Sequence, residues 1–146
     1  KRIKDWWGGK LIIKGIMDPD DAKMAQKCGA DALVVSNHGG RQLDGVNSSI
    51  STLPEIKKAV SNMEVLMDGG ISSGQDILKA IAMGAEGVMI GRSFVYGLSA
   101  GGKEGVLKSL EILNKELDMT MALCGRRDIK DVGRDIIKDC PFFEKN

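Results

Sequence analysis

The fold is decided by residues 11–36, LIIKGIMDPDDAKMAQKCGADALVVS, because this stretch contains the signals of a strand, a helix and a second strand. The apolar run Leu11-Ile12-Ile13 is typical of a strand that is buried on both faces. Asp18 can cap the helix that follows, and Gly29 can adopt the left-handed conformation that ends it. A second buried strand is expected from Ala32 to Ser36. The stretch therefore predicts parallel strands joined by a helix.

The same pattern recurs 55 residues later, which indicates an internal repeat. The second copy begins with Val65-Leu66-Met67, has Ser73 and Asp76 at its helix start, and has Gly84 at its helix end. It then enters a strand expected from Gly87 to Gly91. The identical pairs include Gly15 and Gly70, Ile16 and Ile71, Asp21 and Asp76, Ala25 and Ala80, Gly29 and Gly84, and Ala30 and Ala85.

Further helices are expected between and after the copies. One is predicted from about Leu53 to Ser61, with Thr52 as its cap and Pro54 in its first turn. A longer helix is predicted after Gly101-Gly102, followed by a helical tail that reaches Ile136-Ile137. The apolar face of the longer helix consists of Val106, Leu110, Leu113 and Leu117.

These elements make four βα units, which form either an open doubly wound sheet or part of a closed (β/α)8 barrel. A complete barrel needs about 250 residues, so four units correspond to about half of one. The periodicity leaves both alternatives open, and the duplication favours the half-barrel. We expect an α/β protein of the (β/α)8 TIM-barrel family, here about the second half plus a C-terminal helical tail.

Composition limits the classes of protein and partner. The chain of 146 residues is 42% hydrophobic and carries a formal charge of +1, so we expect one domain over residues 1–146 and no nucleic-acid partner. Cys28, Cys124 and Cys140 lack paired spacing, so neither a disulfide framework nor a metal site is expected. No signal peptide or membrane span is apparent. We expect a cytoplasmic protein, with peripheral membrane association left open.

Residues with chemical functions follow each predicted strand. Lys14 follows the first strand, and His38 and Arg41 follow the second. Asp68-Gly69-Gly70 follows the third and Gly91-Arg92 the fourth. In parallel α/β folds the active site forms at the carboxyl ends of the strands. Histidine takes up a proton near neutral pH, arginine binds carboxylates with two hydrogen bonds, and glycine lets the backbone approach a phosphate.

Each of these residues also has an ordinary interpretation. Lys14 can be a solvated lysine at a strand end, and His38 before two glycines can be a turn residue. Asp68 can cap a turn, and Gly69-Gly70 can be a tight bend. Their presence at four successive strand ends favours a ligand site over four separate coincidences.

Four segments carry a resemblance to a known family. The chain resembles the FMN-dependent α-hydroxy acid dehydrogenases and oxidases, the group that contains L-lactate dehydrogenase, glycolate oxidase and mandelate dehydrogenase. The similarity covers nearly the whole chain, and the His-Gly-Gly-Arg segment is its most specific part. The segments are Leu11-Ile12-Ile13-Lys14-Gly15-Ile16, Ser36-Asn37-His38-Gly39-Gly40-Arg41-Gln42-Leu43-Asp44, Asp68-Gly69-Gly70-Ile71 and Ile90-Gly91-Arg92.

The resemblance implies an FMN-dependent oxidation of an L-2-hydroxy acid, similar to lactate or glycolate, to the 2-oxo acid. His38 would be the catalytic base and would contact the substrate, and Arg41 would bind the substrate carboxylate. The electron acceptor stays open. The implied FMN-binding residues are Lys14 near flavin N1 and O2, Ser36 near the pyrimidine edge, and Asp68, Gly69, Gly70, Gly91 and Arg92 around the ribityl chain and phosphate.

The chain departs from the family pattern in two respects. Ser72 stands where the family has an arginine that reaches the FMN phosphate, so weaker flavin binding is expected. The segments that supply the first half of the barrel are also missing from this sequence. We therefore expect a C-terminal half that is inactive alone and either forms homo-oligomers or pairs with an N-terminal half. The alternatives are a non-catalytic flavin- or phosphate-binding half-barrel and a remnant without a ligand.

Overall fold

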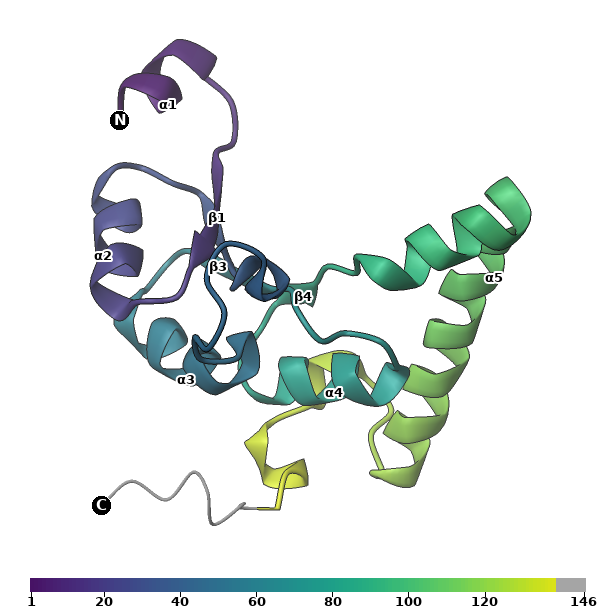
Figure 1. Ribbon diagram of the computed structural model, residues 1–146. Coiled ribbons are helices and arrows are strands. Elements are labelled where there is room, and N and C mark those ends of the chain that lie inside the picture. Colours follow the sequence, from purple (N-terminus) through teal and green to yellow (C-terminus); the bar gives the residue numbers. More distant parts are fainter. Residues whose placement is uncertain (139–146) are drawn as a thin grey trace.

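The computed structural model describes residues 1–138 and contains one parallel sheet with the strand order β1-β2-β3-β4. The chain enters the sheet through a short helix, α1, and leaves it through a long helix, α5 (Figure 1). The strands are β1 (Ile12–Ile16), β2 (Ala32–Val35), β3 (Glu64–Met67) and β4 (Gly87–Val88), and the α-helices are α1 (Arg2–Trp7), α2 (Pro19–Lys27), α3 (Ser49–Ala59), α4 (Gly74–Ala82) and α5 (Arg92–Leu123). Three short 3₁₀ helices are η1 (His38–Gly40), η2 (Ile129–Asp131) and η3 (Arg134–Ile136).

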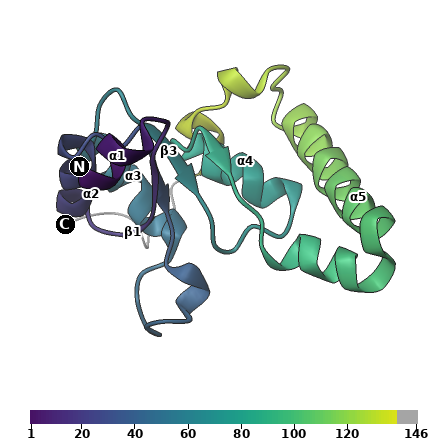
Figure 2. The ribbon, with the colours of Figure 1, turned by 90° about the horizontal axis from the view of Figure 1, so that it is seen from above.

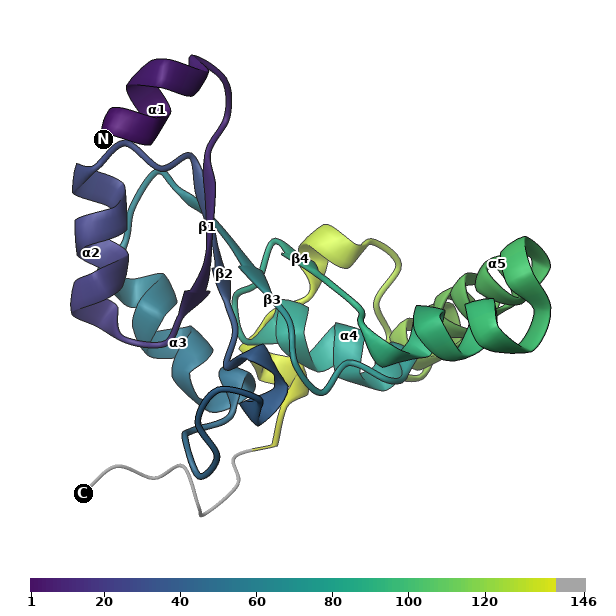
Figure 3. The ribbon, with the colours of Figure 1, turned by 45° about the horizontal axis from the view of Figure 1, so that its top comes forward.

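The strand order decides between the two architectures that the sequence left open. A doubly wound sheet reverses its order and carries helices on both faces. Here the order follows the chain, and α2, α3 and α4 form an arc along one side of the sheet (Figures 1 and 3). Sequential parallel strands with all crossover helices outside form the wall of a barrel. The expected fold class, four βα units of a TIM barrel, is confirmed.

The core lies between the sheet and these three helices. Leu33 of β2 and Val65 of β3 point to this side and are completely buried. Ala22 of α2, Ile56 of α3 and Ala80 of α4 cover them. Burial of each of the larger aliphatic side chains stabilises the folded state by about 1.5–3 kcal/mol. The core thus fixes the strands whose carboxyl ends carry the candidate site.

The predicted helix signals of the repeat are confirmed. The Asp18 carboxylate accepts hydrogen bonds from the backbone N–H of Asp20 and Asp21. Ser73 and Asp76 form a reciprocal capping box at the start of α4. The residues that follow α2 and α4 include two glycines in the left-handed region, Gly29 and Gly84.

One predicted helix boundary is wrong and another is confirmed. α3 begins at Ser49 after Ser48, four residues earlier than expected, and the Thr52 hydroxyl donates to the Ser49 carbonyl oxygen at 3.2 Å instead of capping the helix. Ser49 and Thr52 are buried, so packing against the core extends α3 beyond its local signals. Gly101 and Gly102 have non-helical backbone angles, so α5 consists of two helices joined at a kink, and the second begins after this pair as predicted. The stretch from Arg92 to the kink is also helical, which the sequence pattern did not indicate.

The outer strands also differ from the prediction. β1 is not buried on both faces, because it is an edge of the described sheet, and Ile12 is 53% exposed. β4 contains only Gly87 and Val88, shorter than the expected strand to Gly91. In place of a continuous helical tail, the segment before Ile137 forms η2 and η3.

The two copies also share a hydrogen bond that is formed by different residue types, an aspartate in one copy and a glutamate in the other. The Asp31 carboxylate accepts from the Leu11 N–H at 2.7 Å and pairs with Lys4. At the equivalent place, Glu86 accepts from the Val65 N–H at 2.7 Å. Each carboxylate therefore ties the turn before one strand to the start of the neighbouring strand.

Two further predictions concern membrane-spanning helices and the cysteines. Within residues 1–138, no helix is both long and apolar enough to cross a membrane. Cys28 and Cys124 are free thiols, and Cys140 lies outside the described residues.

Candidate functional site

A cavity of about 930 Å³ opens at the carboxyl edge of the sheet and collects residues from all four strand ends. Lys14 comes from β1, and the loop with η1 contributes His38, Gly39 and Arg41. The loop after β3 and the start of α5 form the rest of its wall. The remaining lining residues are Asp68, Gly69, Gly70, Ile71, Ser72, Met89, Gly91, Arg92, Ser93 and Tyr96.

Lys14 links three strand ends. Its Nζ lies 2.8 Å from the Ser36 hydroxyl after β2 and 2.8 Å from an Asp68 carboxylate oxygen after β3. The pairing of β1 with β2 shifts at Gly15, directly after Lys14, where φ is +97°. A bulge of this kind redirects the end of a strand. The ammonium is consequently held above the ends of β2 and β3 and remains partly exposed to the cavity.

The His38 loop has an unusual backbone conformation. His38 has φ of +55°, in the left-handed region that non-glycine residues rarely occupy. Its N–H donates to the Ser36 hydroxyl at 3.1 Å, and the Gly39 N–H donates to the Asn37 side-chain oxygen at 3.0 Å. Such strain persists only where surrounding contacts hold it, and it concentrates at functional sites.

The two glycine-containing loops leave room for an anion. Gly69 and Gly70 have φ of +91° and +79°, which a residue with a side chain would adopt only with strain. A Cβ atom on Gly70 or Gly91 would meet no atom within 4 Å, so the backbone borders open space. Gly91 also precedes the first turn of α5, where unpaired N–H groups attract negative charge.

The charge of the cavity favours an anionic ligand. Lys14 is neutralised by Asp68. Among the described residues, the side chains of His38, Arg41 and Arg92 form no hydrogen bond or ion pair, and all three residues are exposed. Two guanidinium groups around one cavity suit anionic groups such as a phosphate or a carboxylate.

Ser72 lies on the same rim but is directed to another partner. Its N–H and its hydroxyl both donate to Asp76 Oδ2 at 3.1 Å. Partial burial raises the pKa of Asp76, but the hydrogen bonds from Ser73 and Ser72 outweigh it, so the pKa lies below its ordinary value. The carboxylate therefore stays ionised beside the loop.

The structure brings the predicted site residues together. Eight of the nine line this cavity, and the ninth, Ser36, lies directly beneath it with 2% of its surface exposed. Their chemical roles stay predictions. Sequence reasoning missed Met89, Ser93 and Tyr96 as lining residues. A signal for Tyr96 existed, since it follows Arg92 by four residues and so shares its helix face.

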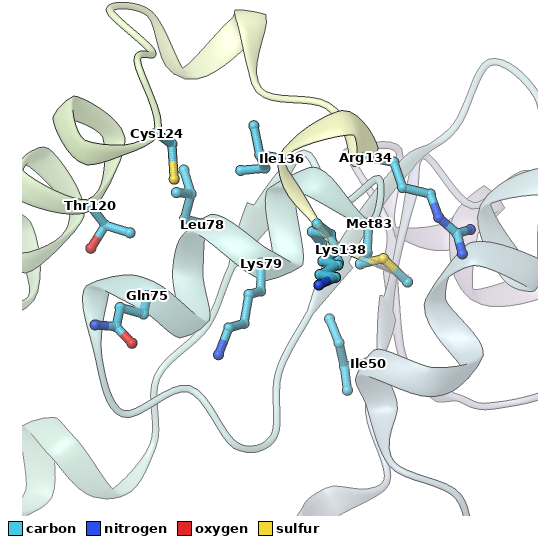
Figure 4. A pocket seen from close by; sticks show the side chains of 11 residues that line it. Ile50, Gln75, Leu78, Lys79, Met83, Thr120, Cys124, Arg134, Ile136 and Lys138 are labelled. Atoms are coloured by element: carbon cyan, nitrogen blue, oxygen red, sulfur yellow. The ribbon is translucent and has the colours of Figure 1, made fainter. Parts of the chain in front are cut away.

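A second cavity, of about 520 Å³, lies between α4, the end of α5 and the segment of η3 (Figure 4). Leu78, Met83 and Ile136 give it a largely apolar wall, and Lys79 and Arg134 are also among the residues that line it. It contains none of the predicted site residues. The strand-end cavity is therefore the candidate functional site.

Comparison with known proteins agrees with this arrangement. The model of the family described as FMN-dependent dehydrogenase matches residues 1–139. L-lactate dehydrogenase of Caulobacter vibrioides is 50% identical over 140 residues, which are 95% of this chain and 37% of that protein. L-lactate dehydrogenase of Pectobacterium atrosepticum is 52% identical over 134 residues, 91% of this chain and 35% of that protein.

Solved structures give the same result. Mandelate oxidase with (S)-4-hydroxymandelic acid superimposes with a TM-score of 0.82 and 46% identity, over 86% of this chain and 36% of that chain. A mandelate oxidase variant with the monooxide FMN adduct superimposes equally well, over 86% of this chain and 40% of that chain. The chain thus spans well under half the length of the relatives it matches. FMN, the expected cofactor, is confirmed at the level of the family, and the chain belongs to the FMN-dependent dehydrogenases.

Proposed function

We propose that this chain contributes the flavin and substrate site for the FMN-dependent oxidation of an L-2-hydroxy acid to the 2-oxo acid. The observation that carries the proposal is the single cavity that unites Lys14, His38, Arg41 and Arg92 with the glycine loops. The L-lactate dehydrogenases at about 50% identity favour a lactate-like substrate over a larger one.

The cavity fits FMN. Gly70 and Gly91 border space that a Cβ atom would otherwise fill, so the backbone can approach a phosphate. Arg92 would pair with that phosphate, and Asp68 and Gly69 would hold the ribityl chain. Lys14, positioned by Ser36, would face the flavin ring and stabilise negative charge on it. FMN, when bound, accepts the two electrons that leave the substrate.

His38 and Arg41 would perform the substrate chemistry. The Arg41 guanidinium would hold the substrate carboxylate through two parallel hydrogen bonds and so fix the α-carbon in place. The His38 imidazole would take the hydroxyl proton as the α-carbon is oxidised. Both side chains are exposed to the cavity. Within the described residues, neither would have to break a hydrogen bond or ion pair to bind the substrate.

Two measurements test this function. FMN should bind the 146-residue chain saturably in a fluorescence titration, and Arg92→Ala should weaken that binding. In the longest reading frame that contains the chain, His38→Asn should abolish turnover of L-lactate with an artificial acceptor while FMN stays bound. Asparagine tolerates a positive φ, so this variant removes the base without adding strain. Unchanged turnover in His38→Asn would overturn the proposed base.

A non-catalytic flavin- or phosphate-binding module is the second candidate. Two observations favour it: the edge strand β1 is exposed, and the chain covers only 37% of the length of the L-lactate dehydrogenase of Caulobacter vibrioides. We expect the isolated chain to bind FMN with little turnover, because it spans only 37% of the length of that dehydrogenase. FMN binding without turnover in the longest reading frame as well would favour the module over the enzyme.

A further inference from the structure

We infer that Ser49 is a positioning residue that holds the His38 loop in register with the Asp68-Gly69-Gly70 loop. The inference rests on the proposed function, in which His38 is the base and the glycine loop holds FMN. Ser49 is the first residue of α3 and does not line the cavity, but 98% of its surface is buried beneath it.

The first step of the argument concerns the backbone next to His38. The Ser49 hydroxyl oxygen accepts a hydrogen bond from the Asn37 N–H at 3.3 Å. Asn37 in turn accepts from the Gly39 N–H through its side chain. His38 lies between these two bonds with its φ of +55°. Ser49 is therefore one of the contacts that keep an unfavourable backbone conformation in place.

The second step concerns the glycine loop. A Cβ atom on Gly69 would stand 3.0 Å from the Ser49 hydroxyl oxygen and 3.3 Å from the Asn37 side-chain oxygen. The Gly69 backbone thus packs directly on the two side chains that support the His38 loop. A change at Ser49 alters both loops, and with them the position of the base relative to the flavin.

The third step concerns the support of Ser49 itself. It lies on the first turn of a helix whose Leu53 and Ile56 are completely buried in the core. The Thr52 hydroxyl donates to the Ser49 carbonyl oxygen at 3.2 Å. Positions on packed helices hold catalytic groups more accurately than positions on free loops. The hydroxyl of Ser49 thus attaches the His38 loop to a helix that the core holds in place.

A pair of variants with nearly equal shapes tests the hydroxyl. Ser49→Thr keeps the oxygen, and Ser49→Val replaces it with a methyl group. Ser51→Ala is the matched control, because Ser51 belongs to the same helical turn and its hydroxyl donates only to the Ser48 carbonyl oxygen among the described residues. Amide hydrogen exchange of Asn37 and His38 is measured in the 146-residue chain, and kcat, KM and FMN affinity in the longest reading frame that contains it.

We expect Ser49→Val to accelerate exchange at Asn37 and to lower kcat by about tenfold or more, as misplacement of a catalytic group does. KM and FMN affinity should change less than about threefold, which separates positioning from binding. Ser49→Thr and Ser51→Ala should behave as the unaltered protein. Equal losses in the Thr and Val variants, or normal Asn37 exchange in Ser49→Val, would overturn the inference. Absence of turnover in the unaltered protein would instead overturn the proposed function, and the exchange measurement would still decide whether Ser49 holds the loop.

Discussion

Ser72 is a residue at which the sequence predicts a departure from the pattern of its family, a serine in place of an arginine. A neutral hydroxyl contributes about 1 kcal/mol to an anion contact, whereas a charged donor contributes about 1.5–3 kcal/mol. The Ser72 hydroxyl is also occupied by Asp76, so little of that interaction is available to a phosphate. Arg92 is the cation that remains at this end of the cavity.

Adding a cation at this position should therefore strengthen flavin binding. Ser72→Arg is expected to lower the Kd for FMN about tenfold, which is the difference between a neutral and a charged contact. Fluorescence titration at low and high salt measures it, because the gain should shrink as salt screens the charge. Ser72→Gln is the control with a long neutral side chain. An equal effect of arginine and glutamine would show that the charge is not the cause.

Asp76 illustrates how one carboxylate organises a helix start. It accepts from the N–H and hydroxyl groups of both Ser72 and Ser73, and these bonds lower its pKa below the ordinary value despite the opposing effect of burial. A carboxyl group whose pKa is lower in the folded state than in the unfolded state stabilises the fold when the pH is above the pKa of the unfolded state. This contribution is lost as the pH falls through the pKa of the folded state.

Asp76→Asn should reduce the free energy of unfolding by about 1 kcal/mol at pH 7, the usual contribution of a helix cap. The difference from the unaltered chain should shrink as the pH falls below about 4, because the carboxyl group is then protonated in both states. Urea unfolding at a series of pH values measures it. A difference that is independent of pH would contradict the role of the ionised carboxylate.

At the level of elements, the approach of α4 to α5 depends on one glycine. A Cβ atom on Gly74 would stand 2.0 Å from the Leu117 backbone nitrogen, and the Gly74 N–H donates to the Glu116 carboxylate at 2.8 Å. The start of α4 thus contacts the α5 backbone directly. Figure 2 shows α5 extending beyond α4, away from the sheet.

Gly74→Ala should separate the two helices and destabilise the chain by about 1–3 kcal/mol, although alanine favours a helix. The neighbouring substitution Gln75→Ala should have almost no effect, because Gln75 is exposed. Thermal and urea unfolding of both variants measure the difference. An increase in stability for Gly74→Ala would mean that α5 does not pack on α4 in solution.

At the level of the whole molecule, the main feature is that the described sheet has two open edges, β1 and β4. β1 presents an unpaired side, and Ile12 on it is 53% exposed. Unpaired edges with apolar side chains promote pairing with other chains. We therefore propose that the isolated chain self-associates or pairs with a further segment of a barrel.

Sedimentation velocity at several concentrations should reveal this self-association. Ile12→Lys should shift the distribution toward the monomer, because a charged side chain at an edge opposes strand pairing. Met24→Lys is the control, since Met24 is 58% exposed on α2 and not on the edge. A monomer at every concentration for the unaltered chain would contradict the proposal.

The elements that depend on local chemistry could be predicted from the amino-acid pattern. The caps at Asp18 and Ser73 and the left-handed Gly29 and Gly84 follow from interactions within a few residues, and the structure contains all of them. The strand-end residues were also identifiable, because parallel strands must present their carboxyl ends at one edge. This reasoning located Lys14, His38 and Arg92 in advance.

Features that depend on distant neighbours could not be predicted from the amino-acid pattern. The start of α3 and the exposure of β1 are set by packing and by sheet order, neither of which a local pattern contains. The same holds for the burial of Ser49 beneath Gly69, since 20 residues separate them in the chain. Local hydrogen bonds specify where helices and strands form, whereas the contacts between strand ends arise only once the core has aligned the strands.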